Sequence, residues 1–377
     1  MSDTAKQWLG RIQKLPHKGK VKIMNVCGGH ERSITMAGLR KVLPEYIELV
    51  PGPGCPVCIC PEEDVYEAIQ LALNEDIILL AFGDMLRVPV NVKKSQARTL
   101  EQAKAQGADI RPVASPSEAV AIAKKNPEKG VVFFAAGFET TTAPVAAMIV
   151  EGVPENLSVL LSGRLTWPAI ATLLDSGEPG FDALIAPGHV ATIMGPEEWN
   201  FVVDKHHIPA AVAGFTAESL LAAMYSTLRQ LNDDHYFLDN CYAQLVRPGG
   251  NSSAQSHLKK AMNVYDANWR GVGNIAASGF ILNDAYSQYD ARKLYPSYAD
   301  EARKRAGEMP AGCDCAQVVM GKIYPNECRL FGTTCVPRNP VGPCMVSDEG
   351  ACRIWWAGGM RESVNINKKN SKVKAIG

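Results

Sequence analysis

The sequence predicts an α/β protein with two similar parallel-sheet domains and a third, mostly helical and loop-rich C-terminal domain. Three observations lead to this prediction. Short apolar runs alternate with helical stretches, the alternation repeats about a hundred residues later, and six of the eleven cysteines fall between positions 313 and 352. Strands that alternate with helices form parallel sheets, so the first two observations define the fold class.

Each strand of the first series ends in a glycine- or proline-rich turn, and a helical stretch follows. The predicted strands of this series are 21–26, 47–50, 77–82 and 110–113, and they define a first domain at residues 20–127. Residues 1–19 ahead of them are predicted to form a short amphipathic packing helix.

The second series repeats the order of the first within a second domain at residues 128–240. Its predicted strands are 131–135, 157–161, 183–186 and 210–213. In both series the fourth strand precedes a helix with a Ser or Thr at its start, Ser115 or Thr216, where a hydroxyl can cap the first turn. The matching order predicts a duplicated domain. A single Rossmann-type sheet is the alternative.

The remaining chain is predicted to be helical at residues 217–310 and rich in loops beyond Pro310. We assign residues 1–19 and 241–360 to the third domain and expect a flexible basic tail at 361–377.

Composition narrows the possible functions. The 377 residues include 39 Lys and Arg and 39 Asp and Glu, so the formal net charge is zero. A neutral chain argues against a general nucleic-acid or membrane-surface partner. No apolar run is long enough to span a bilayer, and the N-terminus lacks the apolar stretch of a secretion signal, which predicts a cytoplasmic location.

The cysteine-rich segment indicates a metal site. Disulfides are disfavoured in a reducing compartment. Structural zinc usually uses two closely spaced cysteine pairs, and here only Cys313 and Cys315 are close. An iron–sulfur cluster accepts irregular spacing and is favoured, with zinc and inert thiols as alternatives. The six cysteines are Cys313, Cys315, Cys328, Cys335, Cys344 and Cys352.

Cys27 and His30 lie in a turn at the carboxyl end of a predicted strand, where parallel sheets bind ligands. Gly28 and Gly29 between them let the backbone approach a ligand closely. A thiolate and an imidazole suit a soft metal such as iron or zinc, and a helix N-terminus lowers a thiol pKa. A buried thiol beside a hydrogen-bonded histidine is the alternative.

Cys55 and Cys58 form a C-x-x-C motif after the second strand. Such a pair cycles between dithiol and disulfide or binds a metal. A redox role is favoured over metal binding and over a purely structural role.

Glu139 and His189 follow later strands of the second series. Glu139 could act as a general acid or base, or could anchor the start of the next helix together with Thr140 to Thr142. His189, in a Pro-Gly-His turn, places a second imidazole at a strand end. No phosphate-binding glycine motif is present, so no nucleotide site is expected.

In combination, these motifs resemble the HypD family of [NiFe]-hydrogenase maturation factors. The resemblance runs from about residue 20 to residue 356, and the motifs occur in the family's order. They are residues 27–30, 52–58, 137–141, 187–190, 344–347 and 349–352.

The resemblance implies a [4Fe-4S] cluster. The family's C-x14-C-x6-C-x16-C pattern fits Cys313, Cys328, Cys335 and Cys352, which leaves the other two cysteines of the segment as non-ligands. The resemblance also implies that Cys27 is the iron-binding thiol of the family, with His30 beside it, and that Cys55 and Cys58 are its redox pair.

The implied function is a redox-active assembly scaffold rather than a conventional turnover enzyme. With a HypC-like small chaperone, the chain would hold iron while cyanide from a HypE-like donor and carbon monoxide complete the Fe(CN)2CO unit. The hydrogenase large subunit is an indirect partner. Glu139 and His189 are expected to move protons or to hydrogen-bond the diatomic ligands. The alternatives are a stand-alone iron–sulfur thiol–disulfide reductase and a zinc-stapled binding protein.

Overall fold

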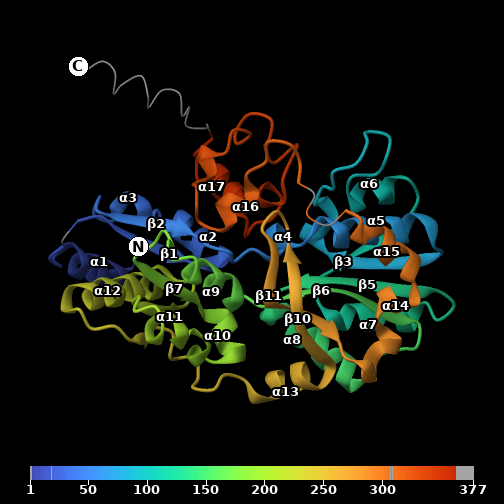
Figure 1. The fold of residues 1–377 in the computed structure, drawn as a ribbon, viewed down its shortest axis with the longest axis horizontal. Helices are drawn as coiled ribbons and strands as arrows, with labels where there is room; N and C mark the ends of the chain where they lie inside the picture. Colours follow the sequence, from blue (N-terminus) through green and yellow to red (C-terminus); the bar gives the residue numbers. More distant parts are fainter. Residues whose placement is uncertain (1, 18, 306, 308, 362–377) are drawn as a thin grey trace.

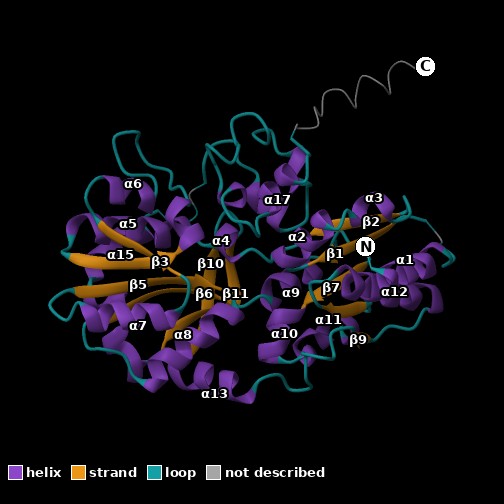
Figure 2. Cartoon of the chain, turned by 180° about the vertical axis from the view of Figure 1, so that it is seen from behind, coloured by secondary structure: helices purple, strands orange, loops and turns teal. Residues whose placement is uncertain are grey.

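The computed structural model describes residues 2–17, 19–305, 307 and 309–361, and its α/β architecture confirms the predicted fold class. Two helix-covered sheets lie side by side, and the cysteine-rich segment lies over the junction between them (Figures 1 and 2).

The first sheet has five parallel strands in the order β2-β1-β7-β8-β9. Ile23 of β1 pairs with Leu49 of β2 on one side and with Ala183 of β7 on the other. The strands are β1 (Val21–Asn25), β2 (Ile47–Pro51), β7 (Ala183–Pro187), β8 (Ala210–Ala213) and β9 (Leu238–Asn240). The neighbouring helices are α1 (Asp3–Gln13), α2 (Gly28–Met36), α3 (Leu39–Val42), α9 (Trp167–Asp175), α10 (Gly188–Met194), η2 (Pro196–Trp199), α11 (Asn200–Asp204) and α12 (Ala217–Asp233).

The second sheet has six strands in the order β10-β11-β6-β5-β3-β4, of which the last four are parallel. The strands are β3 (Ile77–Phe82), β4 (Asp109–Val113), β5 (Gly130–Gly137), β6 (Leu157–Arg164), β10 (Met262–Trp269) and β11 (Gly273–Leu282). The helices of this half are α5 (Glu62–Asn74), η1 (Gly83–Arg87), α6 (Leu100–Ala105), α7 (Pro116–Lys125), α8 (Glu139–Glu151), α13 (Ser252–Ala261), η3 (Asp284–Tyr289), α14 (Ala291–Leu294) and α15 (Pro296–Arg303).

The sheet membership differs from the boundaries predicted at 20–127 and 128–240. β1 and β2 pair with β7 and β8, whereas β3 and β4 pair with β5 and β6. Along the chain, the strands β3 to β6 of the second sheet are therefore inserted between β2 and β7 of the first sheet. When the first four strands of each sheet are numbered along the chain, they lie side by side in the same order in both sheets: second, first, third, fourth. Strands and helices follow one another in the same order along the chain whether the two domains are consecutive or one is inserted into the other. The order of elements therefore does not reveal that the connections after β2 and after β6 pass from one sheet to the other.

The central strand of the second sheet shows why these apolar runs form strands. Val131, Val132, Phe133 and Phe134 of β5 are fully buried. A continuous apolar run is typical of a parallel strand covered on both faces. Each such side chain contributes about 1.5–3 kcal/mol on burial.

The prediction of a largely helical segment at 217–310 is wrong at residues 262–282, which form an antiparallel hairpin. Phe280 of β11 pairs with Gly163 of β6, so the hairpin extends the second sheet. Gly271 and Gly273, both with positive φ, allow the turn between its strands. This glycine pair is the turn signal that the helical interpretation overlooked.

Buried ion pairs attach the hairpin and the segment after it to the second sheet. Arg270 pairs with Glu62 at 2.9 Å, and neither side chain is exposed to solvent. Arg292 of α14 pairs with Asp64 at 2.7 Å and with Glu67 at 3.1 Å, both on α5. These contacts join residues 270 and 292 to α5 of the second sheet.

The unit that carries the cysteines is therefore smaller than the domain predicted from 1–19 and 241–360. It contains α16 (Cys315–Val319), η4 (Pro325–Glu327), η5 (Pro343–Met345) and α17 (Ala351–Ala357). Helix α1, grouped with it in the prediction, packs instead against α12 of the first sheet.

The predicted tail at 361–377 lies outside the described residues except for Arg361. Within the described ranges, no helix has the length and apolar character needed to cross a membrane.

Candidate functional site

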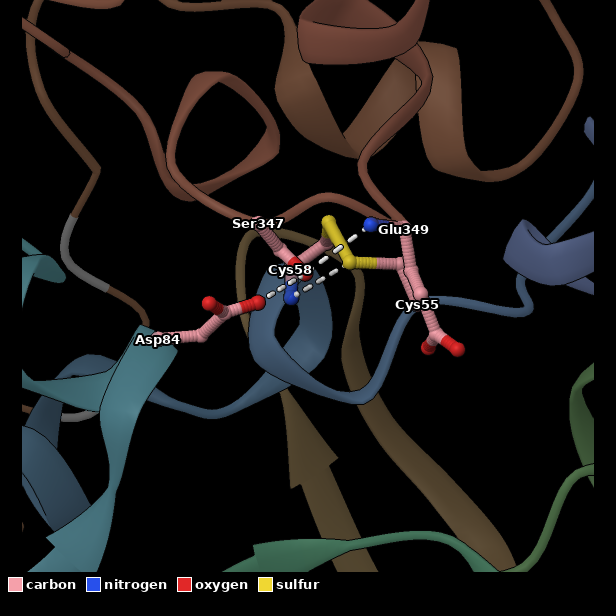
Figure 3. Close-up of a disulfide and its surroundings, with 5 residues drawn as sticks. All are labelled: Cys55, Cys58, Asp84, Ser347 and Glu349. Atoms are coloured by element: carbon pink, nitrogen blue, oxygen red, sulfur yellow. Dashed lines mark hydrogen bonds between the residues drawn. A yellow bond between two sulfur atoms is a disulfide. The ribbon is translucent and has the colours of Figure 1, made fainter. Parts of the chain in front are cut away.

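Cys55 and Cys58 are joined by a disulfide at the start of α4 (Pro56–Ile59), as Figure 3 shows. The C-x-x-C spacing spans one helical turn, so both sulfurs lie on one face of it. Pro56 occupies the first helical position, and the Cys58 amide donates a hydrogen bond to the Cys55 sulfur at 3.2 Å. Both cysteines are buried.

The turn that carries Cys27 packs directly on the turn that precedes this disulfide. The Gly28 amide donates to the Gly54 carbonyl at 3.1 Å. A side chain on Gly54 would collide with the backbone of Val26 and Cys27. The glycine at position 54 is thus what allows the Cys27 turn and the disulfide turn to come together.

Cys27 is half-buried at the N-cap of α2. Burial and the nearby Glu349 carboxylate raise the pKa of its thiol to about 12, and the backbone amides of His30 and Gly29 offset only part of this effect. The expected lowering by the helix N-terminus is present but is outweighed. The thiol is protonated at neutral pH, and a bound cation would ionise it.

His30 is fully buried and neutral. Its Nε2 donates to the Ala213 carbonyl at 3.0 Å, and burial lowers its pKa to about 4. Within the described residues, Nδ1 has no hydrogen-bond partner. A neutral imidazole with a free nitrogen lone pair has the chemistry of a metal ligand.

His189, at the start of α10, lies beside this group. Its ring centroid is 3.9 Å from that of Phe215, which in turn lies 4.9 Å from the His30 ring. A side chain on Gly29 would contact the same Phe215 ring at 2.8 Å. Phe215 therefore packs against both imidazoles and against the Cys27 turn.

Asp84, Ser347 and Glu349 lie next to the disulfide (Figure 3). None of them was predicted as a site residue, although Ser347 and Glu349 belong to motifs of the family resemblance. Ser347 Oγ donates to Asp84 Oδ2 at 2.8 Å and accepts from the Glu349 amide at 3.1 Å. Burial and the Asp84 charge raise the pKa of Glu349. The Gly83-Asp84 turn at the end of β3 was a usable signal, because it lies at a strand carboxyl end like the selected turns.

A cavity of about 650 Å³ adjoins the turn that carries the disulfide, although neither of the paired cysteines lines it. Pro56 and Val57, the two residues between the paired cysteines, form part of its wall, together with Asp84 and Glu349. The cavity therefore gives a ligand access to this wall, where two carboxyl groups lie near the disulfide.

The Glu139 carboxylate is hydrogen-bonded to the loop after β6. It accepts from the Thr166 amide at 2.6 Å and from the Thr166 hydroxyl at 2.7 Å, and it is fully buried. Phe138, rather than a threonine, occupies the N-cap of α8. In this conformation Glu139 anchors α8 to the loop after β6.

We expect Glu139→Gln to reduce the pH dependence of stability. Burial raises the pKa of Glu139 to about 7, above its value in an unfolded chain. The folded state thus favours the protonated form, and this stability is present at pH 4 and is lost as the pH rises through 7. Urea unfolding measures the free energy of unfolding at pH 5 and at pH 8. The decrease in this free energy between the two pH values should be smaller in the variant than in the wild type, by on the order of 2–3 kcal/mol. Equal differences in both proteins would contradict the assignment.

The six cysteines of the C-terminal unit come together in space. The Cys315 thiol lies close enough to the thiols of Cys313, Cys344 and Cys352 to shift the pKa of each. All six are buried except Cys313, which is half-buried. In the described part of the chain, no three His, Cys, Asp or Glu side chains form a site for a single metal ion.

The chemistry of these thiols suits an iron–sulfur cluster, which uses four cysteine thiolates. A side chain on Gly342 would collide with the sulfurs of both Cys313 and Cys315, so this glycine leaves the space that sulfur atoms need. Cys328 and Cys335 lie within electrostatic range of the other thiols. The donor set therefore provides the four thiols of a cubane, with two to spare.

The cysteine-rich unit also contacts both turns of the site. Helix α17 packs against α2, which begins after Cys27, while α16 and η5 pack against α4, which carries the disulfide. Cys60 and Cys241 do not join either group: Cys60 contacts Ser162 at 3.4 Å, and Cys241 lies beside Asp239.

The fold and these residues define a two-sheet α/β protein in which a disulfide-bonded cysteine pair adjoins a second cysteine turn and a six-cysteine unit. A family model described as HypD: Hydrogenase formation hypA family matches residues 3–359. The chain belongs to the HypD family of hydrogenase maturation factors.

Individual relatives agree with this assignment. Hydrogenase maturation factor HypD2 of Bradyrhizobium diazoefficiens is 40% identical over 348 residues, which cover 90% of this chain and 89% of the relative. Hydrogenase maturation factor HypD of Azotobacter vinelandii is 37% identical, with 96% of each chain covered. Hydrogenase maturation factor HypD of Escherichia coli is also 37% identical, with 91% and 90% covered.

Proposed function

We propose that this maturation factor is the scaffold on which iron receives cyanide and carbon monoxide before its transfer to a [NiFe] hydrogenase. The observation that carries the proposal is the direct packing of the Cys27 turn on the disulfide turn through Gly28 and Gly54. It supports a site in which a metal-binding thiol and a two-electron couple act on the same bound iron.

In this proposal Cys27 binds the incoming iron, which is the cargo of the reaction, and His30 is the second candidate ligand. Iron binding releases the Cys27 proton. We assign Glu349 as the base that takes this proton, because its charge acts on the Cys27 thiol. Soft thiolate ligation suits an iron that takes strong-field ligands.

The Cys55–Cys58 disulfide supplies redox equivalents. Its reduction takes up two electrons and two protons and gives two thiols, and reoxidation returns them. Asp84 and Glu349 on the cavity wall are placed to exchange these protons. Glu139 and His189 remain predictions as proton carriers; His189 is the better placed, because it lies beside the Cys27 turn.

A [4Fe-4S] cluster in the C-terminal unit would supply single electrons to the disulfide. Cys328, Cys335 and Cys352 would hold it together with one thiol of the Cys313 and Cys315 pair, of which the family pattern assigns Cys313. The packing of α16 and η5 against α4 supports transfer between the two centres.

The proposed partners are a HypC-like chaperone that contributes a second thiolate to the iron and a HypE-like protein that donates cyanide. The hydrogenase large subunit receives the finished unit indirectly, and the proposed location is the cytoplasm.

Replacing Cys27 with alanine tests the scaffold role. The variant, purified anaerobically with its HypC-like partner, should lose the iron that exceeds the cluster, about one atom per chain, and keep the cluster iron. The matched control is Cys241→Ala, because Cys241 also lies after a strand of the first sheet but outside the site. Elemental analysis measures both. Retention of the extra iron in Cys27→Ala would remove this residue from the site.

A further inference from the structure

A second cavity, of about 260 Å³, lies between α13 and the β10–β11 hairpin. Leu258, Met262 and Phe280 give it apolar walls. It shares no lining residue with the cavity that adjoins the disulfide turn. The proposed function makes no use of it.

One carboxyl group, that of Glu198 in η2, lines this apolar space. Its Oε2 atom is buried and has no hydrogen-bond partner among the described residues. Burial and the charge of Glu139 raise the pKa of Glu198 well above its ordinary value, which favours the protonated form with its hydroxyl donor.

The hairpin wall of the cavity has an unusual backbone. Ala277 lines the cavity with φ at +50°, a left-handed conformation that costs a non-glycine residue roughly 1–2 kcal/mol. Its amide donates to Asp266 Oδ1 at 2.8 Å, opposite an irregularity in strand pairing between Tyr265 and Ala267. Such bulges re-aim side chains and are frequent beside functional sites.

The charges around the cavity restrict what it can hold. Lys259 of α13 lines the cavity and can only donate hydrogen bonds, whereas a protonated Glu198 donates through its hydroxyl and accepts at its carbonyl oxygen. A polar group that accepts hydrogen bonds can therefore contact both side chains, and the body of the occupant must be apolar. An empty apolar cavity of about 150 Å³ holds benzene, so this one has room for a chain of several carbons.

We propose that this cavity is a second binding site, for a small apolar molecule that carries a carbonyl or carboxylate oxygen. The oxygen accepts from Glu198 and Lys259, and the body contacts Leu258 and Phe280. Leu165 and Trp167 also line the cavity, on either side of the Thr166 that holds Glu139. The site does not depend on the proposed maturation function.

Three probes of equal chain length test the ligand class on the full-length protein: octanoate, 2-octanone and octylamine. By calorimetry, octanoate and 2-octanone should bind at one site per chain. Octylamine should bind at least about tenfold more weakly, because its ammonium group cannot accept a hydrogen bond and would face Lys259. Tighter binding of octanoate than of 2-octanone would indicate a carboxylate site, and the reverse would indicate a carbonyl site. Equal binding of all three probes, or no binding of any, would overturn the proposal.

Two variants on the hairpin locate the site. Val264 lines the cavity and is 52% exposed, so Val264→Trp should fold while it fills the cavity, and should weaken octanoate at least about tenfold. Ile281 is similarly exposed, at 40%, but does not line the cavity, so Ile281→Trp should bind normally. Unchanged binding in Val264→Trp would place the ligand elsewhere.

Glu198→Leu tests the polar contact separately. Removing an unpaired buried carboxyl should leave the folded state at least as stable. In this variant, the affinity for 2-octanone should fall to the affinity for octylamine. A variant that still preferred 2-octanone would show that Glu198 is not the donor.

Discussion

Replacing Cys55 or Cys58 with serine will lower hydrogenase maturation by roughly 100-fold or more, and the double variant will be no worse than either single one. A disulfide needs both sulfurs, so the pair acts as a unit and its losses do not add. Serine keeps the size of each side chain in the α4 turn, so the loss should reflect redox chemistry rather than packing. The assay is hydrogenase activity in cells that lack their own copy of the gene and carry each variant.

Cys60→Ala is the control for this prediction. Cys60 is buried two residues beyond the disulfide, and its contact Ser162 retains a hydrogen bond to Asp64 at 2.5 Å when the thiol is removed. Its activity should stay within about twofold of the wild type. Near-normal maturation in Cys55→Ser or Cys58→Ser would exclude the redox role of the pair.

Replacing Cys352 with alanine will lower the iron content from about four atoms per chain to about one or fewer in protein prepared without its partner. Cys352 contacts Cys315 and Cys344 at the centre of the thiol group, and these contacts lower the pKa of Cys352 to about 6. A thiolate at this position favours metal binding. Iron and sulfide assays measure the cluster, and its loss should also lower the melting temperature.

Cys344→Ala provides a control from the same thiol group. Cys344 is fully buried and contacts the same Cys352 thiol, yet the family pattern gives it no ligand role. This variant should keep its iron and brown colour. Loss of iron in Cys344→Ala with retention in Cys352→Ala would show that the pattern assigns the wrong cysteines.

The strands and their glycine-rich ends could be predicted because they depend on local sequence. Apolar runs such as that of β5 give strands directly, and Cys27, Cys55 and His189 were selected for their positions at strand ends. Sheet membership depends on which crossover passes between sheets, and the series of elements along the chain carries no such information.

The residues missed by the sequence analysis owe their places to tertiary packing. Ser347 and Glu349 lie far along the chain from Asp84, and only the position of the C-terminal unit brings them to the disulfide. Glu139 presents the opposite case, because a strand-end carboxylate was expected to act in the site, whereas both of its oxygens accept hydrogen bonds from Thr166. Gly54 had been taken only as a turn residue, although its missing side chain is what joins the Cys27 and Cys55 turns.

Infrared spectroscopy of the anaerobic protein, purified together with its HypC-like partner, tests the scaffold proposal most directly. The wild type should show bands in both the cyanide and the carbonyl stretching regions, and Cys27→Ala should show neither while it keeps the absorbance of the cluster. Iron without these bands in the wild type would contradict the scaffold role and favour a thiol–disulfide reductase that works without a partner.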